Sequence, residues 1–138
     1  NQRYKFVIVD VAGKDSKELR TGMIVANILL IPFRPSQMDL DTMLHLSDLI
    51  DTAKGLNENL ISLAVINMAS TNHLVAEVKE AQEYLQEFPI IKLLNSVIHE
   101  RKIYRDVVPT GEGVVDTDHT KAKDEIENLV KEIFNYDN

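Results

Sequence analysis

The sequence of 138 residues contains no cysteine. Without cysteine the chain has no disulfide framework, no thiolate zinc site and no cysteine nucleophile. This absence is typical of proteins of the reducing cytosol, so a cytoplasmic location is the expectation. Apolar residues make up 44% of the chain and charged residues 27%. Both values are close to those of ordinary globular domains, which argues against intrinsic disorder.

Long hydrophobic runs and a positive net charge are also lacking. The longest apolar run covers residues 23–32 and is interrupted by Asn27. It falls far below the roughly 20 residues that a membrane-spanning helix needs. The net charge is −7, so the surface as a whole does not attract polyanions. We therefore expect no membrane partner, and contact with nucleic acid only through a local basic patch.

Short apolar runs alternate with longer amphipathic segments along the chain. The apolar runs predict strands at residues 5–9, 27–31, 60–66 and 90–94. The amphipathic segments predict helices at residues 16–26, 36–54, 73–86, 99–106 and 120–136. Strands that are apolar throughout are typical of parallel sheets covered on both faces. The alternation therefore predicts an α/β fold, in which a mostly parallel sheet is flanked by helices.

Polar or turn-forming residues follow each predicted strand: Asp10, residues 32–36, Asn67, and the pair Asn95 and Ser96. Ligands of parallel sheets bind beyond the carboxyl ends of the strands, so these residues are candidates for a site. The alternative is that strand ends are polar because they meet water. Asp10 is the strongest candidate, because an acid at a strand end can hold a magnesium-bound water.

Four segments resemble the ParA/MinD family of P-loop ATPases. Residues 7–16, Val-Ile-Val-Asp-Val-Ala-Gly-Lys-Asp-Ser, are similar to the second nucleotide motif of that family. Residues 29–40 resemble the family's strand that is followed by Pro, then by Pro-Ser-Gln and Asp-Leu. Residues 65–67 resemble the family's strand whose terminal Asn hydrogen-bonds the adenine base. Residues 100–115 resemble its late motif. The four segments follow the order of the family along nearly the whole chain.

The resemblance implies a P-loop NTPase fold, a SIMIBI-like three-layer sandwich, and roles for individual residues. Asp10 would be the catalytic Walker B-type acid that acts on magnesium through water. Gly13 would lie near the γ-phosphate, and Asn67 would hydrogen-bond the adenine ring. Pro35 and Asp39 would lie near the nucleotide or the dimer interface.

The resemblance also implies cofactors and partners. ParA-like proteins form homodimers around ATP, bind DNA nonspecifically, and segregate plasmids or chromosomes with a ParB-like DNA-binding adaptor. ATP or ADP and magnesium would then be the cofactors of the full-length parent protein. The local basic cluster that includes Arg101, Lys102 and Arg105 is a candidate DNA contact, since such residues neutralise phosphates. A solvated helix face is the alternative.

One departure from the family pattern is large, because the sequence has no Gly-x-x-x-x-Gly-Lys-Ser/Thr motif. The five glycines lie at positions 13, 22, 55, 111 and 113, and none begins such a loop. Without this phosphate loop the chain lacks a backbone cradle and a lysine for the phosphates. We therefore expect no ATP hydrolysis and no tight nucleotide binding by this chain alone. Two smaller departures are Val11 in place of Thr and Lys14 in place of Arg.

The missing motif leads us to expect that residues 1–138 are the C-terminal portion of a single ParA-like domain, truncated on its N-terminal side. In the family, the phosphate-loop strand lies between the strands that correspond to residues 5–9 and 27–31. Without that strand, backbone groups in the centre of the sheet would be unpaired. They could be paired if residues 5–9 and 27–31 pair directly, or if a second copy supplies the missing edge. The alternative function is a non-catalytic dimerisation or interaction module derived from the same fold.

Overall fold

The computed structural model describes residues 4–72 and 76–136 and has an α/β fold. Three parallel strands form one sheet in the order β1-β2-β3. The strands are β1 (Ile28–Phe33), β2 (Ile61–Ala69) and β3 (Lys92–His99). The helices are α1 (Lys17–Val25), α2 (Gln37–Lys54), α3 (Glu77–Leu85), α4 (Ile103–Asp106) and α5 (Thr120–Phe134). The predicted fold class is therefore confirmed.

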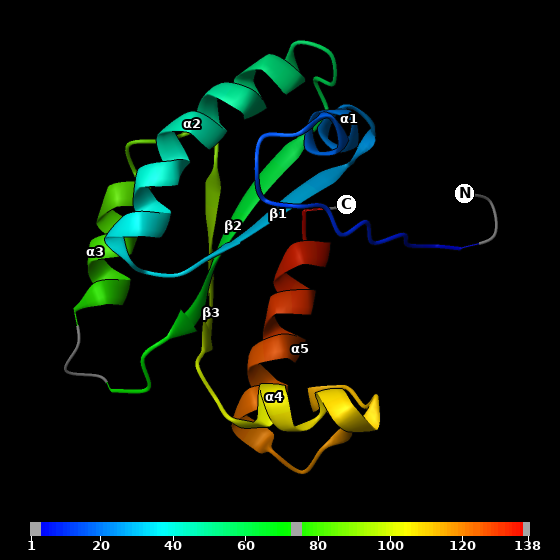
Figure 1. Ribbon diagram of the computed structural model, residues 1–138, viewed down its shortest axis with the longest axis vertical. Coiled ribbons are helices and arrows are strands. Elements are labelled where there is room, and N and C mark those ends of the chain that lie inside the picture. The colour runs from blue at the N-terminus through cyan, green and yellow to red at the C-terminus, as the bar shows by residue number, and fades with distance from the viewer. Residues whose placement is uncertain (1–3, 73–75, 137–138) are drawn as a thin grey trace.

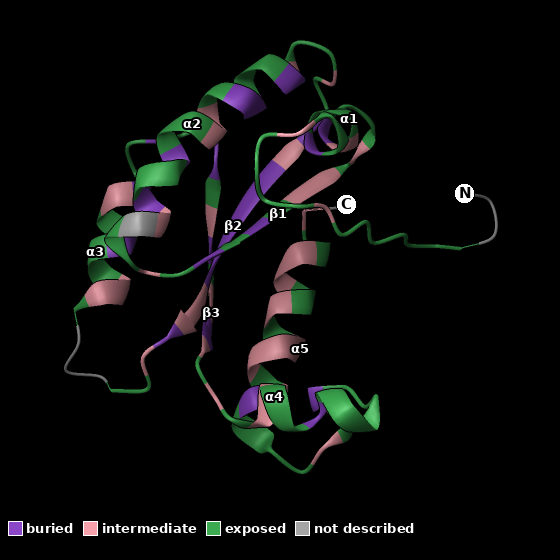
Figure 2. Ribbon diagram, viewed as in Figure 1, coloured by how far each residue is buried: buried purple, intermediate pink, exposed green. Residues whose placement is uncertain are grey.

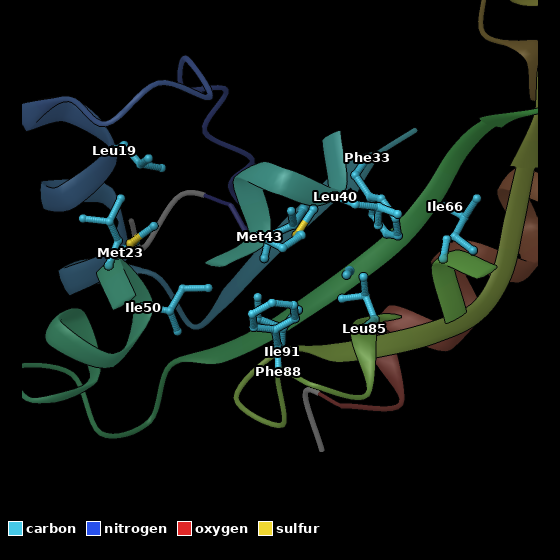
Figure 3. Packing of buried hydrophobic residues seen from close by; sticks show 14 of the residues in the cluster. Leu19, Met23, Phe33, Leu40, Met43, Ile50, Ile66, Leu85, Phe88 and Ile91 are labelled. Atoms are coloured by element: carbon cyan, nitrogen blue, oxygen red, sulfur yellow. The ribbon is translucent and has the colours of Figure 1, made fainter. Parts of the chain in front are cut away.

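Helices cover both faces of the sheet (Figure 1). Helices α1, α2 and α3 pack on one face, where their buried side chains meet those of the strands. Figure 3 shows Met23, Met43 and Ile50 lying together in this cluster. On the other face, α5 packs against Leu63 and Leu94. Strand β2 lies between the two other strands and is the most deeply buried of the three (Figure 2).

The ends of α1 are fixed by side chains, as the sequence predicts for its start. The Ser16 hydroxyl oxygen accepts a hydrogen bond from the Leu19 N–H at 3.1 Å, which caps the helix. At the other end, the Asn57 amide donates to the carbonyl oxygens of Met23 and Ala26 at 3.0 and 2.8 Å. The loop after α2 therefore holds the C-terminal end of α1.

The prediction of a strand at residues 5–9 is wrong. Residues 4–10 belong to no strand, and all of them are exposed (Figure 2). Their apolar composition favours a place in a sheet, but a strand also needs a neighbour for its backbone groups. Strand β1 pairs with β2 alone among the described residues, so the direct pairing of the two segments does not occur.

The limits of the other strands also differ from the prediction. Pro32 lies inside β1, where it was expected to end the strand. The edge position of β1 explains this, because an outward-facing residue of an edge strand needs no N–H partner. Strand β2 continues past Asn67 to Ala69, and β3 extends to His99. Asn95 and Ser96 therefore lie within β3 and do not follow it.

The predicted helices are confirmed with small changes. The helix expected at 99–106 is shorter and begins at Ile103. The helix expected at 73–86 is observed from Glu77, and residues 73–75 lie outside the described part of the chain. Leu44 on α2 and Val130 on α5 are 60% and 43% exposed. No helix in the described residues is both long and apolar enough to cross a membrane.

Candidate functional site

A polar hollow of about 360 Å³ lies at the carboxyl ends of β2 and β3, the place where parallel sheets bind ligands. Both ends meet here because the two strands are parallel. Among the residues that the structure describes, those that line the hollow are Met68, Ser70, Thr71, Glu77, Glu100, Lys102 and Arg105. Hydroxyl groups, carboxylates and two cations thus face one space.

Hydrogen bonds fix the segment after β2, part of which lines this hollow. The Ser70 N–H donates to the Glu77 carboxylate at 2.7 Å, which ties the chain after β2 to the start of α3. The Asn72 N–H donates to the Ser70 hydroxyl oxygen at 3.1 Å. These contacts leave a site suited to a polar ligand with several hydrogen-bonding groups. No group of three or more His, Asp or Glu side chains that could hold a metal ion occurs within the described residues.

The backbone at Met68 has a left-handed conformation, with φ of 56°. This conformation costs a residue with a side chain about 1 kcal/mol or more, and such residues cluster at functional sites. The Asn67 side-chain oxygen accepts a hydrogen bond from the Met68 N–H at 3.0 Å. Asn67 therefore supports the unusual backbone of a residue that lines the hollow.

The five residues expected on the nucleotide side do not line this hollow. Asp10 is exposed on the extended segment, and Gly13 has no atoms within 4 Å of the position a Cβ would take. Asn67 is partly exposed within β2. Pro35 lies between β1 and α2, and the Asp39 carboxylate accepts a hydrogen bond from the Arg34 N–H at 2.7 Å. The five residues thus lie on three different segments.

The basic cluster is divided between the interior and the surface. The Arg101 side chain is 18% exposed, and its Nη2 lies 2.6 Å from the Glu125 carboxylate. This hydrogen bond raises the pKa of Arg101 above its ordinary value. Lys102 and Arg105 are 82% and 70% exposed and line the hollow. Two of the three candidate DNA contacts thus face solvent, while Arg101 is held inside by an ion pair.

Glu125 is the centre of a polar cluster that our reading of the sequence missed. Besides Arg101, its carboxylate accepts the His99 N–H at 3.2 Å and lies 2.9 Å from His99 Nδ1 and 3.3 Å from the Tyr104 hydroxyl. Burial alone would raise the pKa of Glu125, but the hydrogen bonds from Arg101 and His99 outweigh it and lower the pKa. Burial, followed by the charge of Glu125, raises the pKa of Tyr104 to about 12.

Glu132 is the centre of a second polar cluster, which it forms with Asn95 and Ser96 of β3. Its two carboxylate oxygens accept hydrogen bonds from both the N–H and the side chain of Asn95 and of Ser96, at 2.6 to 3.0 Å. Burial alone would raise the pKa of Glu132, but these hydrogen bonds lower it below its ordinary value. Both glutamates follow an inward-facing residue, Ala122 or Leu129, by three positions, which places them near the inner face of α5. The sequence does not show which residues of β3 they meet.

A parallel sheet with helices on both faces and a polar hollow at its carboxyl ends places the chain among the three-layer α/β proteins. Over 75 residues, or 52% of this chain, it is 31% identical to a ParA family protein of Mycoplasma pneumoniae. Over 64 residues, or 46%, it is 31% identical to a ParA family protein of Mycoplasma genitalium. These two similarities support a relationship between this chain and the ParA family.

The extent of the similarity is limited. The matched stretches cover 28% and 24% of the two relatives, so the chain spans about a quarter of the length of the curated proteins that it matches. No family model matches the chain, and no solved structure matches it significantly.

Proposed function

We propose that the chain is part of a ParA-type partition ATPase that acts in plasmid or chromosome segregation. The observation that carries this proposal is the 31% identity to two ParA family proteins. ATP or ADP and magnesium are the proposed cofactors of the full-length parent protein. Its proposed partners are a second copy, a ParB-like DNA-binding adaptor and nonspecific DNA.

The hollow at the ends of β2 and β3 supports an adenine-side role for this segment. Asn67 directly precedes Met68, and Ser70 and Thr71 offer hydrogen-bonding groups around the same space. A purine and a ribose carry several donors and acceptors, which such polar groups can satisfy. Lys102 and Arg105 line the hollow together with the carboxylates Glu77 and Glu100, so its lining carries charges of both signs.

The phosphate side of the proposed site rests on Asp10 and Gly13. Both are exposed, so both are accessible to a magnesium-bound water and to a phosphate. The chain has no phosphate-loop sequence. The proposal therefore requires that loop to come from residues outside these 138, and this chain alone is proposed to bind nucleotide weakly and not to hydrolyse it.

The coding sequence that precedes the codon for Asn1 provides the first test. A Gly-x-x-x-x-Gly-Lys-Ser/Thr motif encoded there is the expected result. In the protein that carries it, Asn67→Ala should weaken the preference for ATP over GTP more than it weakens the binding of inorganic triphosphate. A parent protein that lacks the motif and binds no ATP would contradict the proposal.

A second candidate function is a non-catalytic dimerisation or interaction module derived from this fold. The observation in its favour is that residues 4–10 and one edge of the sheet are both unpaired in the described structure. A parent protein without a phosphate loop that nevertheless binds a partition complex would favour this candidate.

A further inference from the structure

The segment that joins β3 to α4 has two sides with different contacts. Alternating residues of this segment line the polar hollow at the carboxyl ends of β2 and β3: Glu100, Lys102 and Arg105. The residues that alternate with them contact one side chain of α5, Glu125, and these are His99, Arg101 and Tyr104. The segment therefore lies between the hollow and α5, with one side towards each.

Glu125 contacts the inner side of this segment at three points. Its carboxylate accepts the His99 N–H at 3.2 Å, and it lies 2.6 Å from Arg101 Nη2 and 3.3 Å from the Tyr104 hydroxyl. The side chains of Glu125 and Arg101 are only 14% and 18% exposed. Hydrogen bonds of a charged group are stronger than neutral ones, and shielding from water strengthens them further. One carboxylate therefore holds the segment along most of its length.

Helix α4, in which the segment ends, needs this support. It contains four residues, and a single helical turn is unstable without tertiary contacts. Figure 1 shows α4 beside the N-terminal part of α5. The Tyr104 hydroxyl donates to the Ala122 carbonyl oxygen of α5 at 3.4 Å, and Tyr104 packs against the small hydrophobic cluster that contains Ala122. The conformation of α4 thus depends on its contacts with α5.

The cations that line the hollow are only weakly held by their own ion pairs. Lys102 and Arg105 are 82% and 70% exposed. Lys102 lies 3.3 Å from Asp106, and Arg105 lies 3.5 Å from Glu100. Exposed ion pairs of this kind contribute little. The place of both cations at the hollow therefore depends on the backbone that carries them, which Glu125 holds from the other side.

We propose that Glu125 is a positioning residue for the hollow. Through His99 and Arg101 it holds the backbone of residues 99–105 so that Lys102 and Arg105 line the ligand space, although Glu125 does not line that space itself. The inference rests on the proposed function, in which the ligand is ATP bound by the parent protein. Ligand binding in the hollow and the docking of α5 are then coupled, so each stabilises the other.

Hydrogen–deuterium exchange of the 138-residue chain, measured without nucleotide, tests the positioning directly. Glu125→Gln nearly keeps the shape of the side chain and removes the charge that pairs with Arg101. We expect the backbone amides of residues 99–107 to exchange about tenfold faster, because the segment opens locally more often. The amides of α1 and β1 should change little, since neither element contacts Glu125 in the described structure.

Glu132→Gln is the matched control. Glu132 lies on the same helix and also accepts backbone N–H groups of β3, but those of Asn95 and Ser96. This variant should speed exchange at residues 95 and 96 and leave residues 99–107 unchanged. Equal acceleration of residues 99–107 by both variants would overturn the proposal, and so would an unchanged rate there in Glu125→Gln.

Calorimetric titration of the parent protein with ATP separates positioning from a loss of stability alone. Glu125→Gln should raise the Kd of ATP about threefold or more, and Glu132→Gln should leave it unchanged. Arg101→Gln should raise the Kd by the same factor as Glu125→Gln, and the double variant no further, because Glu125 acts through Arg101. An equal loss of affinity in Glu125→Gln and Glu132→Gln would contradict the positioning role.

The two measurements distinguish failure of this inference from failure of the proposed function. If the wild-type parent protein binds no ATP, the proposed function fails, and exchange alone decides whether Glu125 positions the segment. If the wild-type protein binds ATP and Glu125→Gln changes neither the exchange nor the affinity, the proposed function stands and the positioning role is refuted.

Discussion

At the scale of single residues, two glutamates of α5 bind backbone N–H groups of β3. Glu125 accepts the N–H of His99, and Glu132 accepts those of Asn95 and Ser96. Donors on an edge strand have no strand partner, so each carboxylate satisfies groups that would otherwise depend on water. Hydrogen bonds to a charged acceptor are stronger than neutral ones. These two side chains therefore attach α5 to the sheet.

Glu125→Ala should lower the free energy of unfolding by about 2–4 kcal/mol, because it leaves Arg101 without its ion-pair partner. The Arg101 side chain is only 18% exposed, so water replaces the lost contact incompletely. Urea denaturation followed by circular dichroism measures the change. The control is Asp124→Ala, which alters the neighbouring exposed acid of the same helix. Equal losses for both variants would contradict the role given to Glu125.

The stability of the chain should fall in acid because of the same two residues. The pKa values of Glu125 and Glu132 are lowered from 4.5 in the folded state, so the unfolded chain takes up protons first. The contribution of these groups is present above pH 4.5 and is lost as the pH falls through their folded pKa values. Urea midpoints measured across this range should fall with pH. Replacing both residues by Gln should flatten that dependence, and an unchanged slope would refute the assignment.

At the scale of elements, the starts of α1 and α2 offer a matched comparison. Ser16 and Ser36 both occupy the residue before a helix with extended backbone, but only the Ser16 hydroxyl accepts a capping hydrogen bond. Ser16→Ala should therefore cost about 1 kcal/mol of unfolding free energy, and Ser36→Ala much less. Thermal or urea denaturation of the two variants checks this difference. A larger loss for Ser36→Ala would contradict the geometry.

The elements that the sequence predicts well are those whose signal is local. The helix at residues 36–54 is observed as Gln37–Lys54, because a serine, an apolar periodicity and a glycine mark its limits. The three strands of the sheet were also located by their apolar runs. Local pattern thus predicts which segments are helices and which apolar runs can enter a sheet.

The elements predicted poorly depend on neighbours that composition does not specify. Residues 5–9 have the composition of a buried strand but pair with no strand among the described residues, because composition does not specify pairing. Asn67 was expected to end β2, yet its side chain supports a left-handed Met68 and the strand continues. The Glu125 cluster joins residues 26 positions apart, which no short motif reveals.

At the scale of the whole molecule, the described residues form a sheet with two unlike edges and a polar hollow at the carboxyl ends of β2 and β3. The β3 edge is closed by carboxylates of α5, while the β1 edge is open in the described structure. The hollow lies at the carboxyl ends of β2 and β3, and the similarity to two ParA family proteins supports a relationship to that family. The open β1 edge and the absence of a phosphate-loop sequence support the same proposal, that nucleotide binding requires residues outside this chain or a second copy of it.

ATP hydrolysis by the parent protein that carries this chain together with a phosphate loop tests the central claim most directly. Asp10→Ala should abolish hydrolysis, because the proposed acid no longer holds the magnesium-bound water. The circular dichroism spectrum should stay unchanged, since Asp10 is exposed and belongs to no strand or helix of this structure. The control is Asp118→Ala, another exposed acid outside helices and strands, which should hydrolyse ATP normally. Normal hydrolysis by the Asp10→Ala protein would contradict the account.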